Sequence, residues 1–176
     1  AQDLGSREAV KDYKYLRWYP AESDTSIFKN DWFYHDKSKL KSAKDLAQIY
    51  FDTVGGNASL LLNVPPSKNG IIEEKEEKVL KEFKSIIDKT FENKIDYTVS
   101  SNTSPDSILS GIKDGSKTAQ LVNGDATLTF KFDKKEKVKT IVLQEDISKS
   151  QRVEAFEIYA KVPGGYKQVY SGTTIG

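Results

Sequence analysis

Ala58-Ser59-Leu60-Leu61-Leu62-Asn63-Val64 is a short, continuous apolar run that Pro65-Pro66 closes. A run of this length between turn residues is typical of a strand that is covered on both faces in a parallel sheet. The residues before the run have the pattern of a helix. A helix followed by a buried strand indicates an α/β unit.

Helices are predicted on both sides of this strand. Before it, Ser38 is a candidate N-cap and Gly55-Gly56 a terminator, and the apolar residues between them recur at helical spacing: Leu40, Ala43, Ala47, Tyr50 and Val54. After it, four glutamates open a second helix, where negative charge favours the positive end of the helix dipole: Glu73, Glu74, Glu76 and Glu77. The apolar face of this helix consists of Val79, Leu80, Phe83, Ile86, Ile87 and Phe91. The four carboxylates are expected to be solvated, because glutamate is rarely buried, and they are assigned no chemistry.

Both tryptophans and the only histidine of the chain lie in one segment ahead of the first helix. Residues 18–27 read W-Y-P-A-E-S-D-T-S-I, and residues 32–35 read W-F-Y-H. The segment has no sustained periodicity and contains Pro20, so it is predicted as a strand end that runs into a long loop. Aromatic rings can stack on the C–H face of a sugar, and carboxylates and an imidazole can bind hydroxyls and transfer protons. This composition indicates a carbohydrate site, although a packed loop explains the composition alone equally well.

The pattern changes after Asn93 to short β-rich segments separated by Ser, Asn, Asp and Gly. Strands are predicted at 97–100, 126–132, 138–144, 153–162 and 166–170, because apolar and polar residues alternate in them. These segments indicate a second domain, an antiparallel sandwich. The predicted boundary lies near residues 92–96, which gives domains of 1–93 and 94–176.

The composition excludes several classes of function. With a net charge of +1 and lysines interleaved with acidic residues, the chain offers no basic face for nucleic acid. No apolar run approaches the roughly 18 residues of a membrane span. The absence of cysteine excludes disulfides, cysteine–zinc sites and a cysteine nucleophile, and Asp106, Asp114 and Asp125 lack the spacing of a calcium loop. We therefore expect no metal, no cofactor, no nucleic-acid partner and no membrane insertion.

The ordered pattern W-x-P-x-E-x-D-x-S-I followed by W-F-Y-H resembles a segment of the α-L-fucosidases of glycoside hydrolase family 29, the one that carries their general acid/base. The stretch V-G-G-N-A-S-L-L-L-N-V-P-P-x-x-x-G at residues 54–70 follows in the order of that family. Residues 141–147, 151–153 and 172–176 look like the discoidin-like C-terminal domain of the same enzymes. The resemblance covers nearly the whole chain.

The resemblance implies a fold that is α/β plus all-β, namely the C-terminal portion of a (β/α)8-like barrel followed by an incomplete antiparallel β-sandwich. Residues 60–64 would form the last barrel strand and residues 75–91 the closing helix. The resemblance also implies that Glu22, on a loop at the C-terminal face of the barrel, is the general acid/base of a retaining exo-α-L-fucosidase. The E-x-D-x-S-I form resembles the subgroup that acts on α-1,3- and α-1,4-linked fucose of branched glycans.

The remaining candidate site residues are aromatic or polar neighbours of Glu22 in the sequence. Trp32 is expected to form an apolar wall against the sugar, and Trp18 and Tyr34 to line or support the pocket. His35 is expected to bind a hydroxyl, although a lone histidine is more often structural. Asp24 is expected to orient the loop or a sugar hydroxyl.

A retaining mechanism needs a second carboxylate about 5–5.5 Å from the first. In the family this aspartate lies upstream of the segment with which this chain begins, so the nucleophile is expected to be absent from these 176 residues. Asp24 is an alternative nucleophile, because alternate side chains of an extended segment share a face. A few barrel elements alone leave strand edges unpaired, so the chain is expected to be a piece truncated at both ends. Its expected partners are the missing N-terminal part of the same barrel and fucosylated glycans.

Two other classes of function remain open. One is a non-catalytic carbohydrate-binding or adhesion module, although the predicted sandwich has no tryptophan and no cluster of loop aromatics. The other is a structural scaffold within a larger assembly. The substrate class implied by the resemblance predicts a secreted protein that is extracellular or lies at the cell surface.

Overall fold

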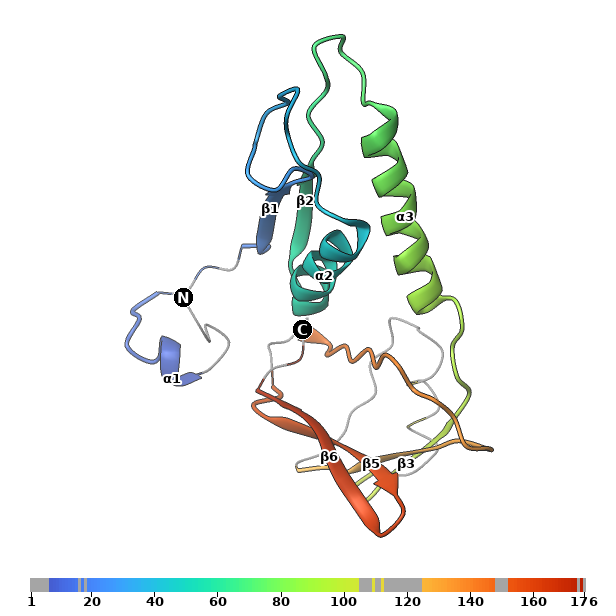
Figure 1. The fold of residues 1–176 in the computed structure, drawn as a ribbon. Helices are drawn as coiled ribbons and strands as arrows, with labels where there is room; N and C mark the ends of the chain where they lie inside the picture. The colour runs from blue at the N-terminus through green and yellow to red at the C-terminus, as the bar shows by residue number, and fades with distance from the viewer. Residues whose placement is uncertain are drawn as a thin grey trace. The chain divides into compact units, whose positions relative to one another are not determined.

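A computed structural model describes residues 7–15, 17, 19–104, 109, 112, 125–147, 152–173 and 175. The chain divides into two compact units, one formed by Tyr15–Lys94 and the other by Ala1–Lys14 together with Ile95–Gly176. Figure 1 labels the helices and strands of both units. Every candidate site residue predicted from the sequence belongs to the Tyr15–Lys94 unit.

The Tyr15–Lys94 unit contains a parallel two-stranded sheet. Strand β1 (Glu22–Ser26) pairs with strand β2 (Ser59–Asn63), with Glu22 opposite Ser59 and Ser26 opposite Asn63. The strands are connected by helix α2 (Ala43–Thr53) and the 3-10 helix η1 (Val54–Gly56), and helix α3 (Glu74–Phe91) follows β2. The parallel strand predicted within residues 58–64 and the helices on both sides of it are confirmed.

Helix α2 begins four residues later than the sequence indicated, because Ser42 and not Ser38 is its N-cap. The Ser42 hydroxyl accepts a hydrogen bond from the Asp45 N–H at 3.2 Å, and the Asp45 carboxylate accepts one from the Ser42 N–H at 2.9 Å. This reciprocal capping box satisfies backbone N–H groups that a helix start leaves free. Asp45 also stabilises the start of the helix through its charge, and the hydrogen bond from the Ser42 N–H lowers the pKa of its carboxyl.

The residues just before this N-cap are extended and paired across a loop. The Lys29 N–H donates to the Lys39 carbonyl, and the Lys41 N–H donates to the Ile27 carbonyl, both at 2.8 Å. Backbone groups that are paired in this way cannot also join the first turn of a helix. The prediction of a helix start at Ser38 was therefore wrong.

The core of this unit lies between the sheet and the two helices. Ile27 and Phe28 are fully buried, and Leu46 of α2 is 1% exposed. Partly buried side chains from the strands, the loops and α3 surround them: Tyr34, Leu40, Leu62, Val64, Val79, Leu80 and Phe83. Helices α2 and α3 also meet through an edge-on aromatic contact of Tyr50 with Phe83, with ring centroids 6.1 Å apart.

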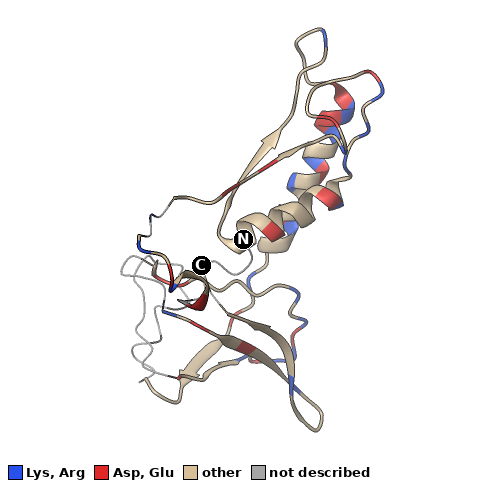
Figure 2. Ribbon diagram, turned by 90° about the vertical axis from the view of Figure 1, so that its left-hand side faces the viewer, with Lys and Arg blue, Asp and Glu red and all other residues tan. Residues whose placement is uncertain are grey.

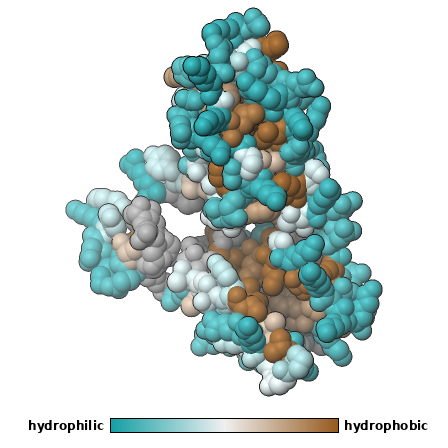
Figure 3. Space-filling model, in the orientation of Figure 1, coloured by the Kyte–Doolittle hydropathy of each residue, from teal (hydrophilic) through white to brown (hydrophobic). Residues whose placement is uncertain are grey.

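Strand β2 is covered on one face only in the described part of the chain. Leu60 and Leu62 are half-buried and face a hollow that is also lined by residues of α2 and α3. Leu61 points to the opposite face and is 51% exposed. Apolar side chains also reach the surface elsewhere in the molecule, as Figure 3 shows. The prediction that both faces of this strand are covered is therefore wrong for these residues.

Helix α3 carries charged residues of both signs along its surface (Figure 2). Glu76 departs from the expectation of four solvated glutamates, because it is only 1% exposed. Its position shares the core-facing side of the helix with Leu80 and Phe83, four and seven residues further on. Both carboxylate oxygens of Glu76 lack a hydrogen-bond donor among the described residues, and the Lys75 ammonium lies 3.7 Å from one of them. None of the described helices is long and apolar enough to cross a membrane.

The other unit contains a short helix, α1 (Arg7–Val10), and two antiparallel strand pairs. Strand β3 (Thr98–Ser101) pairs with β4 (Leu128–Lys131), and strand β5 (Phe156–Val162) pairs with β6 (Gly165–Gly172). The turn between β5 and β6 contains Gly164 at a φ of 93°, a left-handed conformation that favours glycine. The antiparallel strands predicted at four of the five segments are confirmed.

The fifth segment, residues 138–144, was predicted as a strand and is irregular in the structure. Its apolar side chains, including Ile141 and Val142, are exposed. A strand requires a neighbour that pairs with its backbone groups, and among the described residues no strand pairs with this segment. Alternating residues alone were therefore a misleading signal here.

From the described core we expect two leucine substitutions in this unit to differ greatly in their effect on the free energy of unfolding. Leu46→Ala should lower the free energy of unfolding by about 2–5 kcal/mol, because it leaves a cavity beside Ile27 and Phe28. Leu61→Ala, at an exposed position, should change it by less than about 0.5 kcal/mol. Urea unfolding followed by tryptophan fluorescence measures both, since both tryptophans lie in this unit. Equal losses for the two variants would contradict the described core.

Candidate functional site

Two carboxylates share the open face of the sheet. Side chains of a strand alternate between its faces, and in β1 Glu22 and Asp24 are exposed whereas Ser23 and Thr25 are half-buried. Asp24 is paired in register with the exposed Leu61 of β2. The face that the helices leave uncovered therefore presents Glu22, Asp24 and Leu61 together.

The segment of residues 27–41, here called the aromatic loop, leaves the C-terminal end of β1. Its base is closed by the backbone pairing of residues 27–29 with 39–41. The Lys41 ammonium donates to the Ser26 carbonyl at 2.6 Å and to the Phe28 carbonyl at 2.5 Å. Burial lowers the pKa of this lysine. The two ends of the loop are thus joined by main-chain and side-chain hydrogen bonds.

The far part of the aromatic loop is bound to β2 and to the connection between β2 and α3. The Asn63 side-chain amide donates to the Trp32 carbonyl at 2.6 Å. The Tyr34 hydroxyl donates to the Glu73 carboxylate at 2.8 Å, and Lys75 lies 3.0 Å from the other oxygen of Glu73 and 5.3 Å from the centroid of the Tyr34 ring. These contacts hold the backbone on which the candidate aromatic residues stand.

A second link between the same two segments is an ion pair of Asp36 with Lys68. The Lys68 ammonium lies 2.8 Å from the Asp36 carboxylate, and the hydrogen bond from Lys68 lowers the pKa of that carboxyl. Both side chains are largely exposed. Exposed pairs contribute little to stability because water screens them, so this pair supplements the contacts of Asn63 and Glu73.

The exposed part of the aromatic loop presents Trp32 and Phe33 to solvent, at 45% and 71% exposure. Tyr34 points inward, where its ring meets the buried Phe28 edge-on with centroids 6.2 Å apart. His35 is exposed, and its backbone N–H donates a hydrogen bond to the Ser38 hydroxyl. The geometry thus favours a supporting role for Tyr34, and it leaves the Trp32 ring and the His35 imidazole free to meet a ligand.

The structure separates Glu22 from the aromatic loop by the length of β1. Glu22 is the first residue of the strand and lies opposite Ser59, whereas Trp32 is bound to Asn63 at the other end of β2. Four residues of strand correspond to about 13 Å. The prediction that Glu22 sits on a loop at the C-terminal ends of the strands is wrong, because it is part of β1. Trp18, another predicted site residue, lies outside the described residues.

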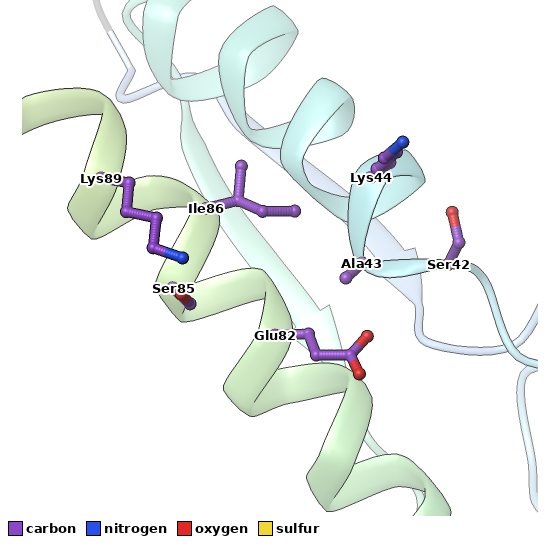
Figure 4. Close-up of a pocket in the computed structure, with 7 residues that line it drawn as sticks. All are labelled: Ser42, Ala43, Lys44, Glu82, Ser85, Ile86 and Lys89. Carbon is purple, nitrogen blue, oxygen red and sulfur yellow. The ribbon is translucent and has the colours of Figure 1, made fainter.

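Two hollows of this unit lie on the helix side of the sheet. One, of about 410 Å³, is lined by Ser42, Ala43 and Lys44 at the start of α2 and by Glu82, Ser85, Ile86 and Lys89 of α3, as Figure 4 shows. Another, of about 350 Å³, is lined mainly by apolar residues of α2, β2 and α3. Neither contains a candidate site residue. Glu22 and Asp24 on the sheet and Trp32 on the aromatic loop are exposed, so the candidate site is an open surface.

Sequence reasoning missed Asn63, Glu73 and Lys75. Asn63 was counted only as part of an apolar run and Glu73 only as part of a solvated cluster. One signal was available, since a polar residue ends an otherwise apolar strand at the edge where loops meet. Glu73 and Lys75 share one distant partner, Tyr34, and no local pattern indicates it.

Comparisons with known proteins agree on one family. The sequence profile of the family named Alpha-L-fucosidase matches residues 5–90. The Arabidopsis thaliana protein Alpha-L-fucosidase 1 is 31% identical over 172 residues, a match that covers 90% of this chain and 34% of that protein. The chain spans about a third of the length of the curated relatives it matches.

Solved structures give the same similarity. A Bacteroides ovatus protein, provisionally called an α-L-fucosidase, is 40% identical with a TM-score of 0.71, and the match covers 100% of this chain and 28% of that one. A Ruminococcus gnavus GH29 fucosidase in complex with fucose has a TM-score of 0.70 at 22% identity, over 93% of this chain and 35% of that one. The second likeness concerns the fold alone.

The hydrogen bond of Tyr34 with Glu73 predicts a broad pH range in which the loop is held. This bond raises the pKa of Tyr34 above its ordinary 10.0 and, together with Lys75, lowers the pKa of Glu73 below its ordinary 4.5. The contribution of Glu73 is lost only as the pH falls through its lowered pKa, and that of Tyr34 only as the pH rises through its raised pKa. The contact should therefore persist from about pH 5 to pH 9.

Titration of a ring-labelled tyrosine signal by NMR measures this, with Tyr34→Phe to assign the signal. Glu73→Leu should bring the pKa of Tyr34 back toward 10.0. A Tyr34 pKa at its ordinary value in the unsubstituted chain would contradict the described contact.

Proposed function

We propose that this chain, which is similar to the α-L-fucosidases of glycoside hydrolase family 29, forms part of the active site of a retaining exo-α-L-fucosidase. The observation that supports the proposal is the open face of the sheet. There Glu22 and Asp24 stand on neighbouring positions of one face, and a loop that exposes Trp32 is fixed at the end of the same sheet. Glycoside hydrolysis uses a pair of carboxylates, and an exposed indole can stack on the sugar ring.

Glu22 is assigned the role of general acid/base. It protonates the departing glycosidic oxygen and, as a carboxylate, then removes a proton from the water that hydrolyses the glycosyl-enzyme. The nucleophile is assigned to an aspartate of the polypeptide beyond these 176 residues. Asp24 is the alternative nucleophile, and its Cα lies about 6.6 Å from that of Glu22 by the rise of a strand.

Fucose is placed between Glu22 and the aromatic loop. Their backbones are about 13 Å apart along the sheet, a separation that leaves room for one pyranose ring between the two side chains. Trp32 forms the apolar wall, His35 binds a hydroxyl, and Tyr34 supports the loop from within. We keep Trp18 as a pocket residue on the basis of its place in the sequence pattern.

The architecture we propose for the whole enzyme completes the sheet. Among the described residues, β1 and β2 each have one strand neighbour, so their outer edges lack partners. We assign residues 1–93 to the last part of a (β/α)8-like barrel, whose remaining strands pair with these edges, and residues 94–176 to part of a discoidin-like β-sandwich. The proposed substrates are α-1,3- and α-1,4-linked fucosides of glycans, and the proposed location is extracellular or at the cell surface.

One observation favours a second candidate, a non-catalytic carbohydrate-binding module. Tyr159 of β5 pairs with Gln168 of β6, and Lys161 pairs with Tyr166. Tyr159 and Tyr166 are therefore diagonal neighbours on one face, both exposed, with polar side chains beside them. A surface of this kind can stack on sugar rings, and it was not evident from the sequence. In a binding module of this kind, sugar affinity would depend on Tyr159 and Tyr166 and not on the residues around Trp32.

The role of Glu22 predicts a selective loss of turnover. Glu22→Gln in the full-length enzyme should lower kcat for a fucoside by about 100- to 10,000-fold, because it removes the transferable proton. Fucose binding, measured by calorimetry, should persist, since glutamine keeps the size and polarity of the side chain. Glu74→Gln, which changes an exposed glutamate in the first turn of α3, is the matched control and should leave turnover unchanged. Full activity of Glu22→Gln would remove Glu22 from the mechanism.

A further inference from the structure

Asn63 bonds to both the start and the far part of the aromatic loop. It is the last residue of β2, and its carbonyl accepts a hydrogen bond from the Ile27 N–H at 2.9 Å. Its side-chain amide donates to the Trp32 carbonyl at 2.6 Å. One residue of the sheet thus fixes two points of the loop that are five residues apart.

Glu73 fixes a third point of the loop, and its side chain does not make the hydrogen bond that is usual for an N-cap residue. Glu73 is the N-cap of α3, where a side-chain oxygen normally accepts from an N–H of the first helical turn. Its carboxylate makes no such bond and instead accepts from the Tyr34 hydroxyl and pairs with Lys75. The Glu73 side chain therefore binds the loop and leaves the first turn of α3 without a side-chain cap.

These contacts leave the loop fixed while its ligand-facing side chains stay exposed. Trp32 is held through its backbone carbonyl, and the residue is 45% exposed. Tyr34 is held through its hydroxyl and through its edge-on contact with Phe28. A loop that is ordered before the ligand arrives does not have to be ordered during binding, which preserves affinity.

We propose that Asn63 and Glu73 are positioning residues that hold the aromatic loop in the conformation in which Trp32 meets the sugar. The inference rests on the proposed function, because it requires that the loop contacts substrate. Neither residue touches the reacting atoms, so both act on ground-state and transition-state binding alike. Their removal should therefore raise KM and leave kcat nearly unchanged.

The kinetic test uses the full-length enzyme. Asn63→Ala and Glu73→Leu should each raise KM for a fucoside about tenfold, with kcat within about twofold of the unsubstituted enzyme. Glu73→Gln should restore most of the affinity, because its amide oxygen can still accept from Tyr34. Asn93→Ala and Glu82→Leu are matched controls at exposed positions beyond the first turn of α3 and should leave KM unchanged.

A second measurement reports the loop without depending on hydrolysis. In the full-length enzyme labelled with fluorotryptophan, the 19F NMR signal of Trp32 is identified by its loss in Trp32→Phe. Asn63→Ala should sharpen this signal, because the Trp32 ring becomes more mobile. Tyr34→Phe, which keeps the ring against Phe28 and removes only the hydroxyl, should do so to a smaller extent and covers the case in which Asn63→Ala fails to fold.

The two measurements separate the possible failures. An unchanged Trp32 signal in both variants would overturn the inference, because the contacts would not restrain the loop. A more mobile Trp32 with an unchanged KM would also overturn it, because the restraint would not serve binding. Absence of fucoside hydrolysis by the unsubstituted full-length enzyme would instead overturn the proposed function. It would also remove the proposed role of these contacts in substrate binding. A raised KM, a nearly constant kcat and a more mobile Trp32 support the inference.

Discussion

The parallel pairing of β1 with β2 is the constraint on which the Tyr15–Lys94 unit depends. Because the strands run in the same direction, the segments that leave their C-terminal ends meet at one edge of the sheet. The aromatic loop and the connection to α3 are therefore neighbours. Parallel strands also need a crossover, and α2 supplies it on the face that holds the core. The opposite face, with Glu22 and Asp24, is left open by the same geometry.

The fold could be predicted from the sequence where local pattern and tertiary environment agree. The run of leucines at 60–62 indicated the parallel strand, and the spacing of Val79, Leu80 and Phe83 indicated the buried side of α3. Prediction failed where a distant partner decides the conformation. Residues 39–41 are extended because they pair with residues 27–29, and no helical propensity could reveal this.

Burial was the property that local pattern described least well. Leu61 lies between Leu60 and Leu62 in one run of leucines, yet it is exposed because the helices lie on one face of the described sheet. Glu76 is the reverse case, a charged residue that is buried on the core side of an amphipathic helix. The burial of Leu61 and of Glu76 depends on which elements pack against them. The sequence of a single strand or helix does not contain this information.

The sequence predicted which residues belong to the candidate site, but it did not predict their positions in the fold. The ordered pattern around Glu22 and Trp32 selected the residues, because it resembles the segment of the family 29 α-L-fucosidases that carries their general acid/base. It could not place Glu22 at the start of a strand, nor the aromatic residues at its far end. It also could not select Asn63 and Glu73, which lie 31 and 39 residues from the groups they bind.

The bond between Tyr34 and Glu73 also joins a loop to the first residues of a long helix. An irregular loop of this length would by itself open and close with little resistance, because few of its backbone groups are protected. Joined to α3, it can open widely only when that contact breaks or the start of the helix unwinds. The loop and the start of α3 therefore form one cooperative unit, and the amide protons of Lys29 and Lys41 should exchange with solvent at rates that reflect the stability of that unit.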